Sequence, residues 1–536
     1  MRIGLIAGFV MLFNGFMIGE IVDENYSKYG TLTPIRQGIR GVTPFWNEYA
    51  FRFIYVPSFN FSPVQGAVKY RFTAAGDDGK VYKFEAGRPD ALLTPIWLEL
   101  PIAQFRLKVE AVTPDGNVSL VGERVFEKAA PYNGQYRQEN YDYSQSARRA
   151  MDEFFKLDIV KDWLKTGKPS PQYQYRNRYA AKMISTVADG AALYAAMEPK
   201  PDNLQEVLQI GKAAADYLLS IRYPADLPVE NFPPTYYGME KEGHMDVNNC
   251  MITEAAEAGY AYIRLSKVTG DTKYLEAANK IADTYKKLQL PNGTWYLVVD
   301  IKTGKPVFDN YANPQCIVNF LDALIKDYGR SDLAEVVDKA VQWTIANPCR
   351  TFNWQNQFED MVPEKAYKNL SRGEATSFAQ WLVRNAAKDS VYIAMAKEII
   401  MYSEDQFVVW SNAPINTNRQ TEYVLFPAEY YATDKWVMPC VCEQYLFWQP
   451  VNASSVSMIS TYKSVYELTG EKIYLEKAKD LADSVVYAQE KYHNGQYLTY
   501  LTTVERDYWM NCTVATAREM YAFGEFVKEM RVAATE

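Results

Sequence analysis

The sequence is poor in the residues and patterns that mark several common classes of protein. It has only 2 histidines and 6 cysteines in 536 residues, and no pair of C-x-x-C motifs suggests a zinc site. It also lacks a phosphate-binding glycine loop, a serine nucleophile elbow and a histidine pair that would bind zinc. The formal net charge is −8, and no run of like charges forms a binding tail. These absences argue against nucleic-acid binding and predict no cofactor.

Long hydrophobic runs are also absent, except at the beginning of the chain. Arg2 is followed by the apolar stretch 3–18 and then by the small and acidic residues of "GEIVDEN". This stretch is short for a membrane span and has the form of an export signal. We therefore interpret residues 1–22 as a signal peptide. The expected product is exported and soluble, periplasmic if the host is Gram-negative, and does not span a membrane.

Residues 23–130 have the alternating pattern of β-strands. "AVKYRFTAAGDDGKVYKFEA" and "FRLKVEAVTPDGNVSLVGERVF" each read as a strand, a tight turn and a second strand. Several such strands within about a hundred residues predict an N-terminal immunoglobulin-like β-sandwich. The earlier segment "PFWNEYAFRFIYVP" is interpreted either as the first strand or as an arm that packs on the next domain.

Residues 131–536 have a helical period instead, and the predicted helices come in pairs. One phrase occurs twice, as "TGDTKYLEAANKIADTY" from Thr269 and as "TGEKIYLEKAKDLADSV" from Thr469. The glycine suits the end of one helix, and the acidic residue after it suits the start of the next. The repeated phrase therefore predicts a helical hairpin that recurs along the chain.

The hairpins predict a closed ring. Five hairpins can be read directly, and the unpaired helices predicted at 144–165 and 509–530 would supply a sixth if they pack together. The predicted fold class is thus α+β multidomain, a β-sandwich followed by an (α/α)6 toroid, also called a six-hairpin barrel. An open α-solenoid is the alternative, but its repeats would be shorter and more uniform.

The long loops that precede the inner helices of such a ring meet at one mouth, which makes them the expected site of function. These loops are rich in aromatic residues, in a sequence that holds 41 tyrosines and 11 tryptophans in total. Flat rings with polar edges suit a groove that binds sugars. The rings predicted to contact a glycan are Trp295, Trp354, Tyr445 and Trp448.

Carboxyl groups in the same loops are candidates for acid–base chemistry. Glu359 and Asp360 follow a polar and aromatic segment, and Glu443 lies among aromatic residues that would raise its pKa. Glycoside hydrolysis needs such a pair, one acid that protonates the leaving oxygen and one carboxylate that activates water or attacks. We predict Asp360 and Glu443 as the pair, in an order that the sequence leaves open, and Glu359 as a substrate contact.

A second chemistry is left open by His244, which lies in a mouth loop near Asn248, a predicted substrate contact. With Tyr296 it would form the proton-transfer pair of a lyase, an enzyme that cleaves uronate-containing chains by β-elimination. Either chemistry on a uronate needs cations, and Arg372 and Arg419 are predicted to hold the carboxylate because a guanidinium matches it in two places.

The succession "NFPPTYYG", "NGTWYLVVDIKTGKP", "FEDMVPE", "SEDQFVVW" and "CEQYLFWQPVNAS" resembles exported carbohydrate-active enzymes of gut Bacteroidetes, and is most similar to glycoside hydrolase family 154. The resemblance implies a β-glucuronidase on an (α/α) barrel. It does not identify the catalytic pair, and polysaccharide lyases share the toroid.

The leading prediction is therefore an exo-acting hydrolase that removes terminal glucuronic acid from a uronic-acid-containing glycan. A uronate-specific lyase and a non-catalytic glycan-binding protein are the alternatives, and a homo-oligomer is compatible with each.

Overall fold

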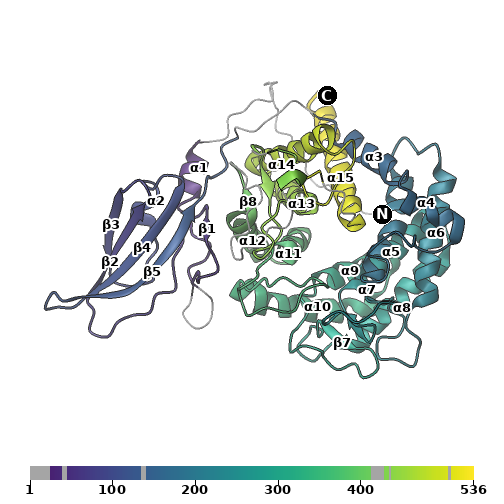
Figure 1. The fold of residues 1–536 in the computed structure, drawn as a ribbon, viewed down its shortest axis with the longest axis horizontal. Coiled ribbons are helices and arrows are strands. Elements are labelled where there is room, and N and C mark those ends of the chain that lie inside the picture. Colours follow the sequence, from purple (N-terminus) through teal and green to yellow (C-terminus); the bar gives the residue numbers. More distant parts are fainter. Residues whose placement is uncertain are drawn as a thin grey trace, which may run out of the picture.

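The computed structural model describes residues 24–38, 45–134, 141–411, 428–433, 436–504 and 509–535. These residues form a β-sheet unit near the N-terminus and a larger ring of helices, which lie beside each other in Figure 1. The predicted signal peptide, residues 1–22, and the predicted uronate ligand Arg419 lie outside the described residues.

Six inner helices of the described chain form the closed ring, each packed against the next and the last against the first. They are α5 (Ala180–Ala196), α7 (Glu254–Thr269), α9 (Gln315–Tyr328), α11 (Gly373–Arg384), α13 (Asn452–Thr469) and α15 (Met510–Thr535). The helices that pack outside them are α3 (Tyr143–Phe154), α6 (Leu204–Ile221), α8 (Thr272–Leu288), α10 (Ala334–Thr344), α12 (Val391–Phe407) and α14 (Lys472–Lys491). A short helix, α4 (Asp158–Thr166), packs on α6. The predicted (α/α)6 toroid is confirmed, and α3 closes it by packing against α15 as expected.

The repeated sequence phrase forms the same corner in two hairpins. Gly270 ends α7 and Gly470 ends α13, both in the left-handed conformation with φ of 71°, which glycine adopts without steric cost. Asp271 caps α8 by accepting a hydrogen bond from the backbone N–H of Lys273. The phrase recurs because it turns the chain from an inner helix to an outer one, and it takes no part in the mouth.

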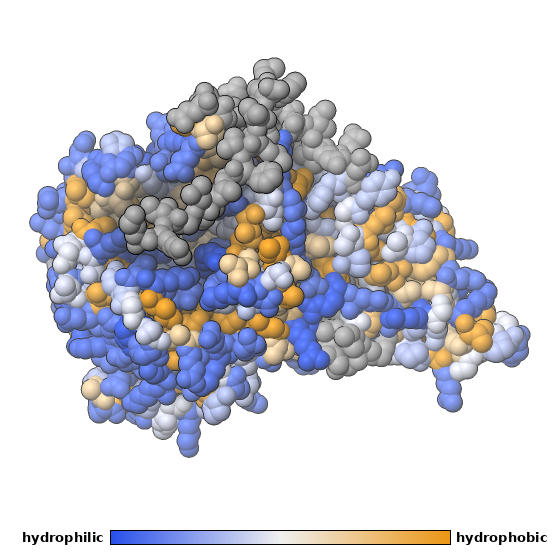
Figure 2. Space-filling view, turned by 180° about the vertical axis from the view of Figure 1, so that it is seen from behind, coloured by the Kyte–Doolittle hydropathy of each residue, from blue (hydrophilic) through white to orange (hydrophobic). Residues whose placement is uncertain are grey.

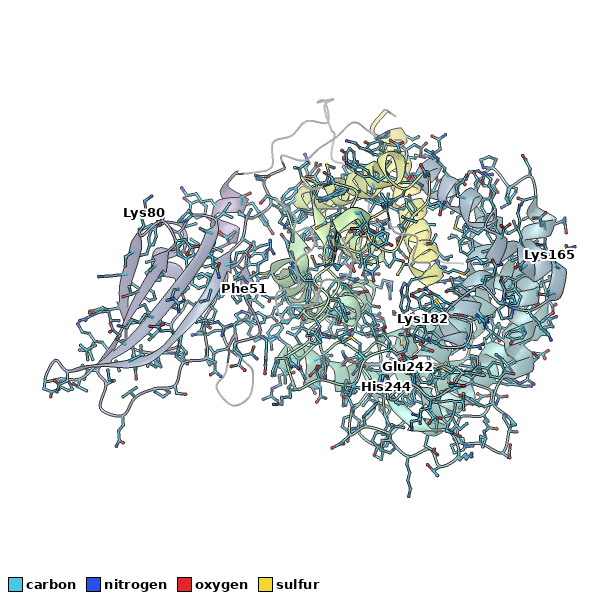
Figure 3. All side chains as sticks on the ribbon, in the orientation of Figure 1. Phe51, Lys80, Lys165, Lys182, Glu242 and His244 are labelled. Carbon is cyan, nitrogen blue, oxygen red and sulfur yellow. The ribbon has the colours of Figure 1, made fainter. Side chains whose placement is uncertain are left out.

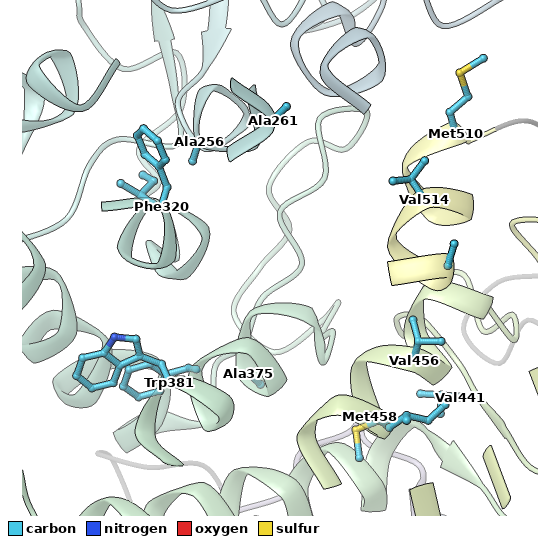
Figure 4. Packing of buried hydrophobic residues seen from close by; sticks show 14 of the residues in the cluster. Ala256, Ala261, Phe320, Ala375, Trp381, Val441, Val456, Met458, Met510 and Val514 are labelled. Carbon is cyan, nitrogen blue, oxygen red and sulfur yellow. The ribbon is translucent and has the colours of Figure 1, made fainter. Parts of the chain in front are cut away.

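Glycines allow the inner helices to approach closely. A side chain at Gly259 of α7 would lie 2.4 Å from the ring of Phe320 in α9, and Figure 4 shows that ring beside α7. A side chain at Gly524 of α15 would lie 2.3 Å from Ser144 in α3, at the contact that closes the ring. Because real Cβ atoms do not approach so near, these positions require glycine.

The N-terminal unit differs from the predicted two-sheet sandwich. Its described strands β1 (Arg52–Phe53), β2 (Lys69–Gly76), β3 (Val81–Ala86), β4 (Ala103–Val112) and β5 (Val118–Lys128) form a single sheet in the order β1-β5-β4-β2-β3. All neighbours are antiparallel except β1 and β5, which are parallel. One face buries Phe105, Leu107 and Val109 of β4 against a core that includes Trp97 of α2 (Thr94–Trp97). Since α2 and the flanking segments cover this face, no second sheet is needed.

The segment "PFWNEYAFRFIYVP", which we interpret from the sequence as a strand or an arm, contains both. β1 pairs with β5, and the residues just after it bind the barrel. The carboxylate of Asp405 in α12 accepts hydrogen bonds from the backbone N–H groups of Ile54 and Tyr55, at 2.6 and 2.8 Å. The guanidinium of Arg52 donates to the carbonyl oxygen of Val408 at 2.8 Å. These contacts join the sheet to the barrel at the end of α12.

Hydrophilic side chains dominate the face shown in Figure 2, with hydrophobic ones in smaller patches. In the part of the chain that the structure describes, no helix is both long and apolar enough to cross a membrane. All the cysteines are free thiols, and all except Cys316 are buried, as expected for small apolar packing residues.

Candidate active site

Two loops that are far apart in sequence lie side by side at the mouth of the barrel. The 350–372 loop precedes α11, and the 440–451 loop precedes α13, with β9 (Cys440–Val441) paired to β8 (Val408–Val409). A bridge joins Ser371 to Gln444, and the amide oxygen of Gln444 accepts hydrogen bonds from Asn356 and Asn369, at 2.9 and 2.7 Å. The predicted pair, Asp360 and Glu443, is therefore carried on two joined loops.

A buried ion pair fixes the first of these loops to the inner ring. Lys182 of α5 lies on the inner side of the ring (Figure 3) and donates to both carboxylate oxygens of Glu359 at 3.0 Å. The side chains of the two residues are 11% and 3% exposed. Burial alone would lower the pKa of Lys182, but the carboxylates of Glu359, Glu257 and Glu254 raise it well above its usual value. Lys182 is therefore a permanent cation in an acidic site.

Asp360, the residue after Glu359, has a raised pKa that bears on its predicted role as an acid or base. Its side chain is exposed, yet the surrounding protein displaces enough water to raise its pKa to about 7. The negative charge of Glu359 raises the pKa further, Lys182 opposes the change, and Glu443 adds to it. Asp360 is thus about half protonated near neutral pH, which a general acid requires. Glu443 on the adjoining loop is therefore close enough to contribute to the pKa of Asp360.

Glu443 is half-buried beside a cation. Burial raises its pKa, while Arg372 and its neighbour Gln444 lower it. Arg372 is 7% exposed and donates to the hydroxyl of Ser454 at 2.5 Å. Burial lowers the pKa of Arg372 to about 10, against the opposing effect of Glu443. Arg372 is therefore close enough to Glu443 for its charge to offset that of the carboxylate.

Other acidic groups of this site were missed in the sequence. Glu254 and Glu257 lie in the first turn of α7, and Glu374 lies in the first turn of α11. Burial, which is the largest cause in each case, raises the pKa of all three, that of Glu374 to about 7. Neither carboxyl oxygen of Glu254 has a hydrogen-bond partner within the described residues. Across the described chain, no group of three or more His, Cys, Asp or Glu residues is arranged to hold a metal ion.

A signal for these residues did exist. Lys182 is the single charge in the first half of the mostly apolar helix that begins "AAKMISTVADG". Glu254 and Glu257 likewise interrupt the run of small and apolar residues in "TEAAEAGYAY". A charge at an apolar helical position is costly unless it has a partner. These opposite charges, on α5 and α7, suggest that the two inner helices face each other. The sequence alone does not show which faces of the helices meet.

His244 reaches this site, whereas Tyr296 does not join it. The Nε2 atom of His244 lies 2.9 Å from the carbonyl oxygen of Glu359, whose other neighbour is the hydroxyl of Tyr236. Tyr296 stacks on Tyr311 instead, with ring centroids 5.7 Å apart. No hydrogen bond or ring contact links His244 to Tyr296 in the described residues, so the geometry does not assemble the pair predicted for a lyase.

The predicted sugar-stacking rings lie mainly in the core. Trp295 and Trp354 are each 1% exposed, and Tyr445 and Trp448 are 5% and 3% exposed. The indole N–H of Trp295 donates to the carbonyl oxygen of Tyr285 at 2.9 Å, and Tyr445 donates to Gln406. Their burial leaves little ring surface for a ligand. These residues belong to the long loops at the mouth, but their side chains turn toward the core. A long loop over a barrel needs buried hydrophobic side chains to hold it in place.

Asn248 also has a local role in the structure. Its backbone and side-chain N–H groups both donate to the carboxylate of Asp246, at 2.9 and 2.8 Å. This is an Asx turn, which stabilises the loop before α7. The structure thus gives Asn248 a part in this turn, and its contact with a substrate stays a prediction.

No protein-family model matches the sequence, and no curated protein matches it. Among solved structures, the chain is similar to the cellobiose 2-epimerase of Spirochaeta thermophila, with a TM-score of 0.50 and 12% identity over 72% of this chain and 98% of that chain. It is also similar to a family 76 glycoside hydrolase from a bovine Bacteroides thetaiotaomicron strain, with a TM-score of 0.49 and 9% identity over 88% and 96%. The likeness to the epimerase is one of fold and agrees with the six-hairpin barrel.

Proposed function

We propose that this chain is a glycoside hydrolase that cleaves a glycan at the mouth of the barrel, with Asp360 and Glu443 as its two catalytic carboxyl groups. The observation that carries the proposal is the junction of the two loops that bear Asp360 and Glu443, made by the bridge of Ser371 with Gln444 and the hydrogen bonds from Asn356 and Asn369 to Gln444. The pKa of Asp360, raised by burial to about 7, agrees with it. Two carboxyl groups whose environments keep one protonated are what this reaction requires.

In the proposed reaction, the carboxyl proton of Asp360 passes to the glycosidic oxygen as the bond from that oxygen to the anomeric carbon breaks. Glu443 then either removes a proton from the attacking water or attacks the anomeric carbon itself. Water completes the reaction in both cases, and one glycosidic bond is replaced by two hydroxyl groups. The separation of the two carboxyl groups in the substrate complex decides between inversion and retention.

Other residues of the site have positioning roles in this proposal. The ion pair of Lys182 with Glu359 holds the loop that carries Asp360 against α5. Arg372 favours the ionised form of Glu443. The reaction needs Glu443 ionised while Asp360 is protonated, because acid and base must differ in charge.

The narrower activity, removal of terminal glucuronic acid, needs a free cation for the uronate. Lys182 is paired with Glu359, and Arg372 lies buried beside Ser454 and Glu443. Among the described side chains of the site, carboxyl groups outnumber cations, which disfavours an anionic sugar. Arg419 is the predicted uronate ligand that would offset this excess of negative charge. The comparison of glucuronides with neutral glycosides as substrates therefore tests the narrower activity.

The test measures released reducing sugar and absorbance of unsaturated uronate together. Neutral and glucuronic acid-containing oligosaccharides are incubated with the native protein and with Asp360→Asn, Glu443→Gln and Arg419→Ala. We expect saturated sugar from the native protein and none above background from the two carboxyl variants. Hydrolysis that persists in both variants overturns the assignment, and an absorbance rise identifies a lyase. Loss in Arg419→Ala on glucuronides alone would support the narrower activity.

A further inference from the structure

A groove on the outside of the barrel has the features of a second ligand site. It has a volume of about 600 Å³ and lies between α10 and the loops that flank β7 (Val298–Asp300), which are neighbours in Figure 1. We call it the Tyr311–Trp343 groove. Its lining residues in α10 follow one face of the helix and are Glu335, Asp338, Lys339, Gln342 and Trp343.

Two aromatic rings of this groove are held in place and still accessible. Tyr311 is 38% exposed and stacks on Tyr296 at an interplanar angle of 15°. Trp343 is half-buried and meets Tyr311 edge to face, with ring centroids 6.4 Å apart. Rings that are fixed before a ligand arrives lose little conformational entropy on binding.

Polar groups beside the rings are available to a ligand. In the described residues, the side chains of Asp338 and Gln342 and the indole N–H of Trp343 have no hydrogen-bond partner. Flat rings with unpaired donors and acceptors around them match the apolar faces and hydroxyl edges of a sugar. A purely apolar groove would fit a protein partner better.

The charge of the groove indicates what kind of sugar fits. Lys339 is paired with Glu335 at 2.7 Å, so the charge of Asp338 remains unbalanced among the lining residues. An anionic chain would therefore be repelled. We propose that the Tyr311–Trp343 groove binds a neutral oligosaccharide, at a position separate from the carboxyl groups in the mouth.

The groove is connected to the proposed catalytic loop through the side chain of Gln357. The side-chain amide of Gln357 donates to the carbonyl oxygen of Tyr311 at 2.7 Å, and its oxygen accepts from the N–H of Asn313 at 2.7 Å. Gln357 precedes Glu359 by two positions in the loop that also carries Asp360. A glycan held in the groove would thus be anchored next to the mouth and raise the local concentration of cleavable chain.

A glycine creates the wall of the groove. Gly293 has a φ of 98°, and a side chain there would lie 2.5 Å from the carbonyl oxygen of Lys339 in α10. The turn at 291–293 can therefore touch α10 only with glycine at this position. This close approach sets the narrow side of the groove.

Affinity electrophoresis in native gels tests the proposal. Yeast mannan, galactomannan, arabinoxylan and barley β-glucan serve as neutral probes, and hyaluronan and polygalacturonate as acidic ones. All proteins carry Asp360→Asn, so that cleavage cannot remove the ligand. We expect a neutral polysaccharide to retard the protein, and Tyr311→Ala or Trp343→Ala to weaken binding about tenfold, which is about 1.4 kcal/mol.

The control is Tyr29→Ala, which removes another exposed tyrosine, 55% exposed, from α1 (Glu24–Gly30). Its retardation should equal that of the parent. The proposal is overturned if no neutral polysaccharide retards the protein, if both groove variants bind as the parent does, or if only acidic chains bind. Cleavage of a small aryl glycoside, measured with Asp360 restored, reports the proposed function separately.

Discussion

The barrel contains two buried lysine–glutamate pairs that look alike and differ in what surrounds them. Lys477 of α14 donates to both carboxylate oxygens of Glu404 in α12, at 2.7 and 2.8 Å. Lys182 donates to both oxygens of Glu359, at 3.0 Å. The first pair lies between outer helices and the second in the mouth.

The partners of Glu404 complete its hydrogen bonding. The indole N–H of Trp410 and the hydroxyl of Tyr462 also donate to its carboxylate, at 3.1 and 3.0 Å. One positive charge meets one negative charge, and neutral donors satisfy the rest. Such a fully satisfied network stabilises the fold.

The mouth pair is surrounded by further acids. Burial is the largest cause that raises the pKa of three of them, Glu254, Asp360 and Glu443. The charge of Glu359 raises these pKa values further, and the charge of Lys182 lowers them. A cluster of carboxyl groups with little water around it costs folding free energy and raises the pKa of its members, that of Asp360 to about 7. This difference indicates which of the two pairs belongs to a reactive site.

The largest expected effect is on activity in the mouth. Asp360→Asn should lower kcat by about 10²–10⁴-fold, the usual contribution of a general acid, because an amide has no proton to give. Glu404→Gln is the control outside the mouth and should keep the kcat of the native enzyme. Steady-state kinetics at 25 °C measure both. Equal losses in the two variants would show that the mouth has no special role.

The next largest effect is on stability in the outer ring. Lys477→Met should lower the free energy of unfolding by about 3–5 kcal/mol, because it leaves the charge of Glu404 buried and unpaired. Urea unfolding followed by circular dichroism measures it. The double variant Lys477→Met/Glu404→Leu should recover most of the loss. If the double variant is as unstable as the single one, packing rather than charge holds α12 to α14.

Ring closure can be broken at one glycine. Gly524→Val should lower the free energy of unfolding by about 3 kcal/mol, because its side chain would overlap Ser144 of α3. Gly373→Ala is the control, since no atom lies within 4 Å of the Cβ position there. Thermal unfolding compares the two. A Gly524→Val variant as stable as the control would contradict the close contact of α3 with α15.

The acidity of Asp360 predicts two pH effects. The raised pKa, about 7, means that kcat/KM should fall as pH rises through 7. The raised folded-state pKa also gives stability that is full below the usual aspartate pKa of about 3.9 and is lost as pH rises through 7. Asp360→Asn should remove that loss.

Urea midpoints at pH 5 and pH 8 measure the stability effect. The native protein should lose on the order of 1 kcal/mol more than Asp360→Asn between these values, a modest figure because water reaches the exposed Asp360 and screens it. Identical changes in the two proteins would place the titrating group elsewhere.

The smallest effect concerns a ring that was assigned to the substrate. Trp295→Phe should change KM less than twofold and lower the free energy of unfolding by about 1 kcal/mol, the value of one hydrogen bond, since its indole donates to Tyr285. Substrate kinetics and urea unfolding measure both. A tenfold rise in KM would return Trp295 to the binding site.

Much of the fold could be predicted from the sequence. The glycine and acidic residue of the repeated phrase identified helix corners, and the helical period gave the six-hairpin ring, because both signals depend on residues close together in the chain. The predicted sandwich failed for the opposite reason. Alternation shows that a strand has one buried face, and it cannot show whether a second sheet or a helix such as α2 covers that face.

The candidate site, like the fold, was predictable from the sequence only in its local features. The helical period was enough to place Asp360, Glu443 and Glu359 in loops before inner helices. The meeting of Lys182 in α5 with Glu359, the inward turn of Trp295 and the outward turn of Tyr311 beside Trp343 became evident in the folded chain alone. Local patterns specify helices and turns, whereas the direction of a loop side chain depends on groups that are hundreds of residues away until the ring closes.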